Sequence, residues 1–261
     1  MVIQINKLLT NKKGLFLAYD HGLEHGPIEF NLKNVDPNYI LDIALEGHFN
    51  GVIMQAGLAE KYHQDYYKDL PLIVKLNGKT TFHSGEPEPA LLCSVERAMR
   101  LGASGVAYTI YVGSEHQQKM MKEFAKVVEV AHDYGLPVIA FMYPRGAKIP
   151  NSYDNDILAY SARMALEMGA DMIKIDYNQN IESFKWVVKN AGKCKILVKG
   201  GDATDDRSFL QKIYDCMQIG VCGFAIGRQV WKHPKPFSMT KAIQSIVFHN
   251  KIVDEAMKFL E

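Results

Sequence analysis

Short apolar runs alternate with helical segments along the whole chain, and this alternation constrains the fold more than any other feature of the sequence. Eight runs have the composition of buried strands: Gly14–Tyr19, Gly51–Gln55, Leu72–Leu76, Gly105–Val112, Pro137–Tyr143, Met172–Tyr177, Lys195–Lys199 and Gly223–Ile226. Helical periodicity occupies most of the intervals, at Asp36–Gly47, Pro89–Leu101, Ser114–Tyr134, Asp154–Met168, Ile181–Ala191 and Asp205–Gln218. The sequence therefore predicts a parallel sheet built from strand–helix units.

The number and spacing of these units favour a (β/α)8 TIM barrel of the α/β class. Eight units in 261 residues match the usual length of that barrel. A doubly wound dinucleotide-binding sheet fits less well, because no G-x-G-x-x-G turn follows the first strand. No linker or change in composition marks a boundary, so we expect residues 1–261 to form a single catalytic domain. Residues 229–261 would supply the last barrel helix and a C-terminal closing helix.

Charge and apolar content argue against several classes of function. Lys and Arg number 30 and Asp and Glu number 29, so the charge balance gives no reason to expect nucleic acid or a membrane as a partner. The first residues lack the apolar region of a signal peptide and no apolar stretch reaches the length of a bilayer span, which favours the cytoplasm. Without a C-x-x-C pair, we expect buried thiols rather than disulfides or structural zinc at Cys93, Cys194, Cys216 and Cys222.

Polar residues gather where the expected strands end. In a TIM barrel the carboxyl ends of the strands surround the active site, so these segments should lie together. The polar segments are Asp20–Pro27, Lys75–Gly78, Phe141–Gly146, Lys199–Asp202 and Gly227–Arg228. The starts of the strands carry mostly Gly, Pro, Lys or apolar residues, an asymmetry that a purely structural barrel does not require.

Lys174 is the residue that packing explains least. Strand alternation sends its neighbours Ile173 and Ile175 to one face, which suits a covering helix, and leaves Lys174 in the barrel interior. An ammonium group is costly there unless it is paired, neutral or used in chemistry. A reactive amine is the functional interpretation, and a strand-end lysine whose stem reaches water is the structural one. Lys75 and Lys199 also lie near strand ends, as rival nucleophiles and as cations that would lower the pKa of Lys174.

Alternation also places Asp20 and Tyr143 inside the barrel, facing Lys174. A carboxylate and a phenol beside a buried amine are the groups that carbonyl chemistry needs, because both can move protons while the amine captures a carbonyl. The sequence also allows a turn-forming or capping role for Asp20 and a core-filling role for Tyr143.

A metal site is the competing interpretation of the first polar segment. His21 and His25 have i, i+4 spacing and Glu24 lies between them, but Gly22 and Gly26 favour a loop rather than a helix that would aim both imidazoles at one ion. No third histidine follows at a recognisable spacing. We therefore expect no metal and no other cofactor.

Taken together, these motifs resemble the archaeal-type class I fructose-bisphosphate aldolases, the DhnA/DeoC-like Schiff-base aldolases. The resemblance rests, in chain order, on Asp20–Pro27, Tyr143–Gly146, Lys174, Gly200–Gly201 and Gly227–Arg228. It implies a TIM barrel that cleaves fructose 1,6-bisphosphate reversibly to dihydroxyacetone phosphate and glyceraldehyde 3-phosphate without a metal. It also implies a sugar-phosphate substrate and a homo-oligomer.

Transferred to this chain, the resemblance makes Lys174 the Schiff-base lysine, Tyr143 a proton-transferring acid or base, and Asp20 a catalytic carboxylate near the imine. Which of Asp20 and Tyr143 performs each proton transfer stays open. The resemblance also implies that one substrate phosphate is bound by Gly200, Gly201, Gly227 and Arg228, and that His25 faces the substrate. Lys199, directly before the glycine pair, is a further candidate for contact with substrate or phosphate. Backbone N–H groups and a guanidinium suit a phosphate dianion.

Some features depart from the family pattern and concern the substrate more than the imine. Lys199 before the glycine pair and Tyr108 on the fourth strand would alter the charge of the site, and Phe141 stands where a larger indole is expected. A Schiff-base aldolase, transaldolase or thiolase of the same superfamily, acting on another phosphorylated ketone, is the alternative. A sugar-phosphate-binding barrel without activity is a further one. Contacts between subunits could come from residues 62–67 and from Ile246, Val247 and Phe248.

Overall fold

The fold is a closed parallel barrel surrounded by helices, seen in a computed structural model that describes residues 2–82, 84–201 and 204–261. Neighbouring strands pair in parallel in the order β1-β10-β9-β8-β7-β6-β3-β2, which confirms the predicted TIM barrel. The barrel strands are β1 (Gly14–Tyr19), β2 (Gly51–Gln55), β3 (Leu72–Lys75), β6 (Ala103–Val112), β7 (Val138–Pro144), β8 (Met172–Ile175), β9 (Lys195–Lys199) and β10 (Gly223–Ile226). Asp202, in the polar segment expected after β9, lies outside the described residues.

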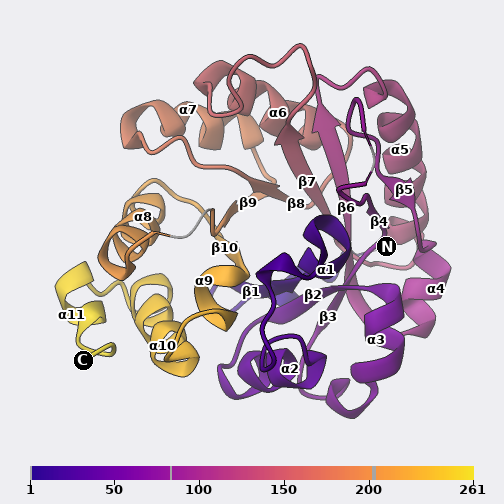
Figure 1. Ribbon diagram of the computed structural model, residues 1–261. Helices are drawn as coiled ribbons and strands as arrows, with labels where there is room; N and C mark the ends of the chain where they lie inside the picture. The colour runs from indigo at the N-terminus through magenta and orange to yellow at the C-terminus, as the bar shows by residue number, and fades with distance from the viewer. Residues whose placement is uncertain (1, 83, 202–203) are drawn as a thin grey trace.

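Helices cover the outside of the barrel, and α1 and α9 lie at the ends of the strands (Figure 1). The α-helices are α1 (His21–His25), α2 (Pro37–Glu46), α3 (Ala56–Tyr62), α4 (Val95–Arg100), α5 (Gln117–Asp133), α6 (Asn155–Glu167), α7 (Ile181–Ala191), α8 (Asp206–Gln218), α9 (Arg228–Trp231), α10 (Pro236–Val247) and α11 (Val253–Met257). Short 3-10 turns are η1 (Ile5–Leu8), η2 (Gly26–Glu29) and η3 (Gln64–Tyr66), and a small antiparallel pair is formed by β4 (Asn77–Gly78) and β5 (Ala90–Leu91).

Several of the helices begin at a side-chain cap that the sequence supplies. The carboxylates of Asp36, Asp154 and Asp205 and the amide oxygen of Asn180 each accept a hydrogen bond from a backbone N–H in the first turn of the following helix. Such a cap satisfies one of the N–H groups that a helix start leaves unpaired. These local signals explain why the predicted and observed starts of α2, α6, α7 and α8 agree within one residue.

The core has two layers, as strand alternation predicts. Alternate side chains of the strands fill the inside of the barrel, and the others pack against the helices. The inner layer consists of Leu8, Phe16, Ala18, Ile53, Ile73, Ala107, Ile139, Phe141, Met172, Leu197 and Ala225. Leu8 comes from η1 rather than from a strand. The outer layer includes Leu15, Leu17, Ile173 and Ile175, so the predicted faces of β1 and β8 are confirmed.

Three local predictions were wrong. Residues 89–101 do not form one helix: β5 pairs with β4, and α4 begins only after Ser94, whose hydroxyl accepts a hydrogen bond from the N–H of Arg97. Residues 21–25 form α1 rather than a loop. The helix is only one turn long and ends at Gly26, whose φ is +71°, so the glycines that suggested a loop are compatible with it. The helix α3 was missed because seven residues containing Gly57 are too short to show a clear period.

Two expectations about side chains were also wrong. Tyr108 does not alter the charge of the barrel interior, because it packs on the outer side of β6 and its hydroxyl donates to Glu123 of α5 at 2.7 Å. Ile246 and Val247 are buried within the chain, where α10 packs against α8 and α11, so they cannot contact another subunit. Residues 229–261, expected to supply the last barrel helix and a closing helix, contain α10, α11 and all of α9 except its first residue, Arg228.

The sequence predicted buried thiols and contains no apolar stretch long enough to span a bilayer. All four cysteines are free and buried, as expected. Among the described residues, no helix has the length and apolar character needed to cross a bilayer.

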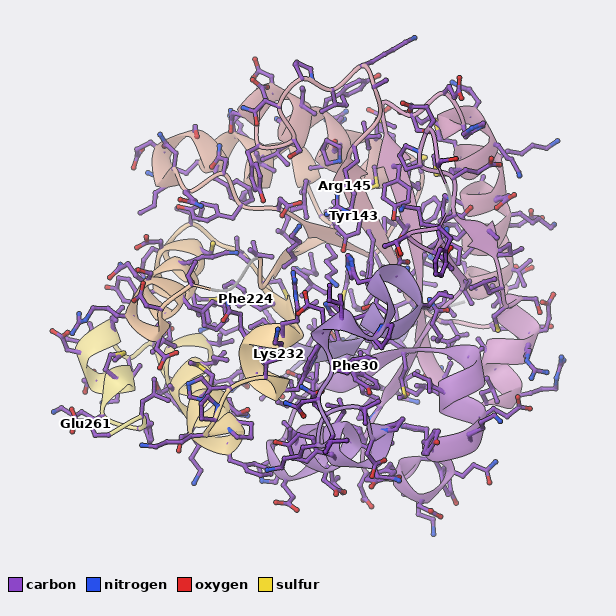
Figure 2. All side chains as sticks on the ribbon, viewed as in Figure 1. Phe30, Tyr143, Arg145, Phe224, Lys232 and Glu261 are labelled. Atoms are coloured by element: carbon purple, nitrogen blue, oxygen red, sulfur yellow. The ribbon has the colours of Figure 1, made fainter. Side chains whose placement is uncertain are left out.

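The side chains drawn in Figure 2 include Tyr143 and Arg145, which lie at the C-terminal end of β7 over the middle of the barrel.

Candidate active site

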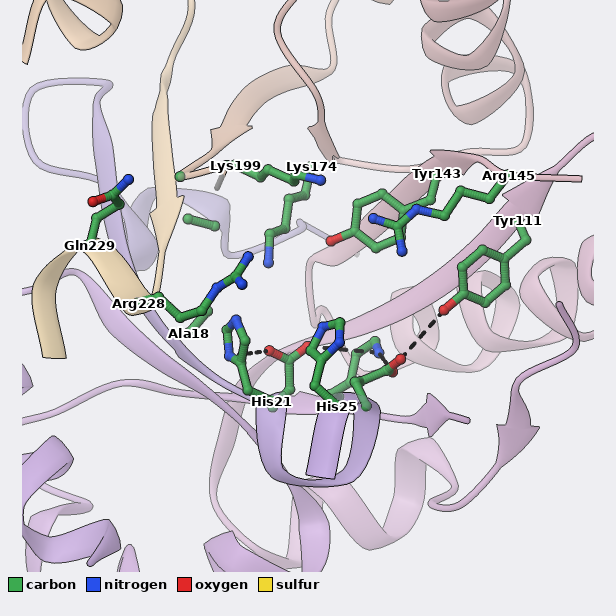
Figure 3. A pocket seen from close by; sticks show the side chains of 17 residues that line it. Ala18, His21, His25, Tyr111, Tyr143, Arg145, Lys174, Lys199, Arg228 and Gln229 are labelled. Carbon is green, nitrogen blue, oxygen red and sulfur yellow. Dashed lines mark hydrogen bonds and ion pairs between the residues drawn. The ribbon is translucent and has the colours of Figure 1, made fainter. Parts of the chain in front are cut away.

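A polar cavity opens at the C-terminal ends of the barrel strands, where such folds carry their active sites. Every site residue predicted from the sequence lines it: Asp20, His25, Tyr143, Lys174, Lys199, Gly200, Gly201, Gly227 and Arg228. Figure 3 shows Arg228 and Gln229 on one side of the cavity and Arg145 and Tyr111 on the other, with Lys174 between them. The structure therefore brings together residues that lie on, or directly after, seven barrel strands that are far apart in the sequence.

Lys174 extends from β8 into this cavity and is 5% exposed. Its Nζ lies 4.2 Å from the centroid of the Phe141 ring, a cation–π distance that orients the amine. Within the described part of the chain, Lys174 forms no ion pair, although Asp20 and Glu24 line the same cavity. Its amine is thus buried and held in place, yet not neutralised by direct contact with an acid.

The two rival lysines are paired. Lys75 Nζ lies 3.1 Å from Glu24 Oε1 and 3.9 Å from Asp20 Oδ2. Lys199 Nζ lies 2.7 Å from Asp176 Oδ1. A carboxylate in direct contact stabilises the ammonium form of a lysine and so makes it a poorer nucleophile. The geometry therefore favours Lys174 over Lys75 and Lys199, a choice that strand alternation alone left open.

The surroundings of Lys174 favour its neutral form. Burial lowers the pKa of Lys174 to about 8; the charge of Asp20 opposes this shift, and the charges of Lys75 and Lys199 add to it. At pH 7 about one molecule in ten then carries a neutral amine, compared with roughly one in a few thousand for an ordinary lysine. The cavity therefore supplies the nucleophile that capture of a carbonyl requires.

Asp20 stands at the end of β1 and at the start of α1, but its side chain does not cap that helix. Burial alone would raise the pKa of Asp20, but the opposing charges, those of Lys174 and then Lys75 first, outweigh burial and lower the pKa to about 2. The group is thus an ionised carboxylate that faces the amine. The capping role that the sequence allowed for Asp20 is excluded by the absence of a capping hydrogen bond.

Tyr143 lies on β7 between two aromatic rings, with centroid distances of 6.1 Å to Phe141 and 6.2 Å to Tyr111. Burial, followed by the charges of Asp20 and Asp176, raises the pKa of Tyr143 well above 10. The phenol therefore stays protonated at neutral pH and can donate a proton or a hydrogen bond into the cavity.

Sequence reasoning missed a set of side chains that share this cavity. Glu24 lies on α1, where it accepts from Lys75 and, at 3.4 Å, from the Tyr111 hydroxyl. Tyr111 has the same strand parity as Ala107, so alternation could have identified it. His21 and Glu24 were considered only as metal ligands, in a segment expected to be a loop, whereas a single helical turn brings both to the cavity.

Glycines and one arginine form the end of the cavity near β9 and β10. Gly201 has a φ of +85°, a conformation that favours glycine, and Gly227 precedes α9. Arg228 Nη1 donates to Glu29 Oε1 at 2.9 Å, and Lys232 Nζ contacts Glu29 Oε2 at 2.6 Å. These hydrogen bonds, that from Lys232 first, lower the pKa of Glu29 to about 2. The guanidinium is thus held at the cavity wall by a permanently ionised acid.

Gly227 leaves no room for a side chain, which yields a first prediction. A Cβ at this position would lie 2.7 Å from His21 Cε1 and 2.8 Å from the Ala18 carbonyl oxygen. We expect Gly227→Ala to displace α9 with Arg228, lowering stability by about 1–3 kcal/mol and raising the KM for a phosphorylated substrate more than it lowers kcat. Thermal unfolding and steady-state kinetics would measure both effects.

Gly57→Ala is the matched control, because no atom lies within 4 Å of the Cβ it would add on α3. That variant should keep the wild-type KM and gain up to about 0.5–1 kcal/mol of stability. Equal KM values for the Gly227→Ala and wild-type proteins would contradict the role assigned to this close approach.

The described residues include no group of three or more His, Cys, Asp and Glu side chains that could hold a metal ion. His21 and His25 do lie on one helical face, with ring centroids 5.7 Å apart. Burial, followed by the charge of Arg228, lowers the pKa of His25, so its imidazole is held in the neutral form.

The sequence and the structure were compared with known proteins. The family described as DeoC/LacD family aldolase matches residues 15–233. The fructose-bisphosphate aldolase class 1 of Thermoproteus tenax is 44% identical over 248 residues, which cover 94% of this chain and 93% of that protein. The protein of the same name from Halobacterium salinarum is 38% identical over 247 residues, which cover 94% of each.

Solved structures give the same picture. A Schiff-base-forming fructose-1,6-bisphosphate aldolase, studied through its reaction intermediates, matches with a TM-score of 0.90 and 42% identity, covering 94% of this chain and 98% of that one. An archaeal fructose-1,6-bisphosphate aldolase, whose catalytic lysine is bound covalently to the carbinolamine intermediate, matches with a TM-score of 0.89 and 42% identity, covering 93% and 97%.

Proposed function

The chain belongs to the DeoC/LacD family of aldolases, and we propose on this premise that the cavity described above cleaves fructose 1,6-bisphosphate. The protein is a class I, Schiff-base-forming aldolase, a lyase that converts the bisphosphate reversibly to dihydroxyacetone phosphate and glyceraldehyde 3-phosphate. One observation supports Lys174 as the residue that carries the chemistry: among the cavity lysines, the buried Lys174 is the one without an ion pair to any described residue.

Lys174 acts as the nucleophile. Its neutral Nζ attacks C2 of the ketose to form a carbinolamine. The carbinolamine hydroxyl then takes up a proton and leaves as water, which gives a protonated imine. When the C3–C4 bond breaks, its electron pair forms a C2=C3 double bond, and the π pair of the C2=N bond moves onto nitrogen. The product is an enamine, and the positive charge on nitrogen is removed. The C4 hydroxyl loses its proton in the same step and becomes the aldehyde carbonyl. Protonation of the enamine at C3 and hydrolysis then release dihydroxyacetone phosphate.

Asp20 and Tyr143 move the protons in this cycle. The ionised carboxylate of Asp20 faces the amine and is suited to accept a proton, and the protonated phenol of Tyr143 is suited to donate one. Their protonation states favour Tyr143 as the donor to the enamine carbon and Asp20 as the acceptor of the C4 hydroxyl proton.

The two ends of the cavity hold the two phosphates. Gly200, Gly201, Gly227 and Arg228 offer backbone N–H groups and a guanidinium to the phosphate on C1, close to Lys174. Arg145 lies across the cavity, with its guanidinium 5.0 Å from the Tyr143 ring. It suits the phosphate on the aldehyde half, while Lys199 and His25 line the space between the ends.

The pH dependence of imine formation provides a second prediction. Because burial lowers the pKa of Lys174 to about 8, the fraction of neutral amine rises tenfold per pH unit below that value and levels off above it. The rate of borohydride-trapped adduct formation with dihydroxyacetone phosphate, measured from pH 6 to 10, should follow the same curve. An inflection near 10.5, the value of an unperturbed lysine, would show that the site does not activate the amine.

The function is tested by incubating the protein with fructose 1,6-bisphosphate and measuring triose phosphate release, with and without a strong chelator. We expect turnover in both cases, since the imine replaces the metal as electron sink. Borohydride should add one dihydroxyacetone phosphate unit per chain, which peptide mapping locates on Lys174. A metal-dependent enzyme would lose activity with the chelator, and a binding protein without activity would gain no covalent mass.

The same reaction suggests a cellular setting. Cleavage and condensation of the bisphosphate are steps of glycolysis and gluconeogenesis, and a role in these pathways supports a cytoplasmic location. A homo-oligomer is supported by Tyr160 of α6 and Trp186 of α7, which are 66% and 50% exposed on two helices that pack against each other. Sedimentation of the purified protein would test the assembly.

A further inference from the structure

His21 lines the cavity, and none of the roles described above uses it. It is the first residue of α1, and its side chain is 14% exposed. Figure 3 shows the imidazole pointing from α1 into the cavity below Arg228. Trp231 packs edge-on against the ring at 5.4 Å between centroids, and Cε1 faces Gly227 so closely that a Cβ there would lie 2.7 Å away. Packing on both sides thus sets the orientation of the ring.

One nitrogen of this imidazole is left without a hydrogen bond. The buried Nδ1 has no hydrogen-bond partner among the residues that the structure describes. The Asp20 Oδ1 atom lies 3.7 Å from Nδ1, which is too far for a hydrogen bond. Hydrogen bonds in active sites often shorten only when substrate binds. A contraction of a few tenths of an ångström would let Nδ1–H donate to Asp20, which leaves Nε2 as an acceptor in the cavity.

The charge of the ring limits what it can bind. Burial lowers the pKa of His21 to about 4; Asp20 opposes the shift, and Lys174 and Arg228 add to it. The imidazole is therefore neutral at neutral pH. A phosphate dianion offers only acceptors, so an unprotonated Nε2 would not bind it. A hydroxyl group can donate to Nε2 and is the matching ligand.

The position of His21 identifies which hydroxyl. The ring contacts Gly227 and lies near Arg228 and Lys174, the residues that take the phosphate and the carbonyl of the ketone. Arg145 and Tyr111, on the aldehyde side, lie across the cavity. After the phosphate and the carbonyl, the remaining polar group of dihydroxyacetone phosphate is its hydroxyl, on the carbon that becomes C3.

We propose that His21 is a specificity residue that accepts a hydrogen bond from the hydroxyl next to the imine carbon and so selects phosphorylated ketones that carry it. This inference rests on the proposed imine chemistry. A site built to hydrogen-bond a hydroxyl discriminates against the analogue that lacks it, because a buried polar atom is then left without a partner.

The test compares two ketones: dihydroxyacetone phosphate and acetol phosphate, which is the same molecule without the hydroxyl. The concentration dependence of borohydride-trapped adduct on Lys174 gives an apparent efficiency for each ketone. We expect the wild-type protein to favour dihydroxyacetone phosphate by about 10- to 100-fold. In the His21→Leu variant, this preference should fall to less than about threefold.

Two amide variants separate the nitrogens of the ring. Gln places its amide near the position of Nε2, and Asn places its amide near the position of Nδ1. His21→Gln should keep most of the preference for the hydroxylated ketone, and His21→Asn should behave like His21→Leu. Adduct formation with acetol phosphate in each variant shows that the fold and the reactive amine are intact.

Three results would overturn the inference. The ketone preference of His21→Leu could equal that of the wild type. His21→Asn could restore the preference where His21→Gln does not, in which case the ring acts through Asp20. All three variants could lose adducts with both ketones, in which case His21 supports the whole site. Absence of any adduct on the wild-type protein would instead refute the imine chemistry itself.

Discussion

The Lys174→Met variant is expected to lose fructose-bisphosphate cleavage by about 10⁴-fold or more and to form no borohydride-stable adduct. Methionine has nearly the length of lysine and suits the buried position beside Phe141, so the fold should persist. Without the amine no imine forms, and the electron pair of the C3–C4 bond has no acceptor. Steady-state cleavage assays and the mass of the borohydride-treated protein would measure the two losses, and circular dichroism would confirm folding.

Lys199→Met is the matched control, because it also replaces a cavity lysine near the end of a strand. That variant should still form an adduct, and the adduct should map to Lys174. It should form more slowly at neutral pH, since one of the cations that lower the pKa of Lys174 is gone. An adduct on Lys75 or Lys199 in the Lys174→Met protein would reassign the nucleophile.

Removing the phenol of Tyr143 should separate imine formation from turnover. We expect Tyr143→Phe to keep adduct formation with dihydroxyacetone phosphate and to lower the rate of cleavage by about 10²–10⁴-fold, the usual contribution of a positioned acid or base. The reason is that the buried phenol stays protonated and faces the site where the enamine needs its proton. Exchange of the C3 proton of dihydroxyacetone phosphate with solvent should slow by a similar factor.

Tyr111→Phe provides the comparison, because this phenol lines the same cavity at 6.2 Å from the Tyr143 ring but donates to Glu24. Its loss should lower turnover by less than about tenfold, the worth of one hydrogen bond. If both variants lost cleavage equally, or if Tyr143→Phe kept the full exchange rate, Asp20 would have to carry the proton at C3.

The pattern of the sequence was sufficient for the barrel. Strand alternation correctly sent Ile173 and Ile175 toward the helices and Lys174 inward, because a strand has a two-residue period that does not depend on its neighbours. Capping residues such as Asp36 and Asp205 marked helix starts for the same local reason. Where a segment was too short to show a period, as in α1 and α3, local signals were insufficient.

The candidate site, like the fold, was predictable from the sequence only in part. That Asp20, Tyr143 and Lys174 would share one cavity followed from the sequence, because parallel strands bring their carboxyl ends to one face of the barrel. Which lysine is left without an acid did not follow, because Glu24 pairs with Lys75 across 51 positions and the partner of Lys199 depends on strand register. The unused imidazole of His21 likewise became apparent only when α9 was packed against it.

By itself, then, the sequence determined the type and order of the elements and the side of each strand on which reactive groups lie, since both depend on periods of a few residues. Only the tertiary structure decided which charges meet, which amine stays neutral often enough to react and which polar atoms are left for a substrate. Those properties depend on distances of 3 to 6 Å between residues far apart in the chain, where burial strengthens every charge interaction.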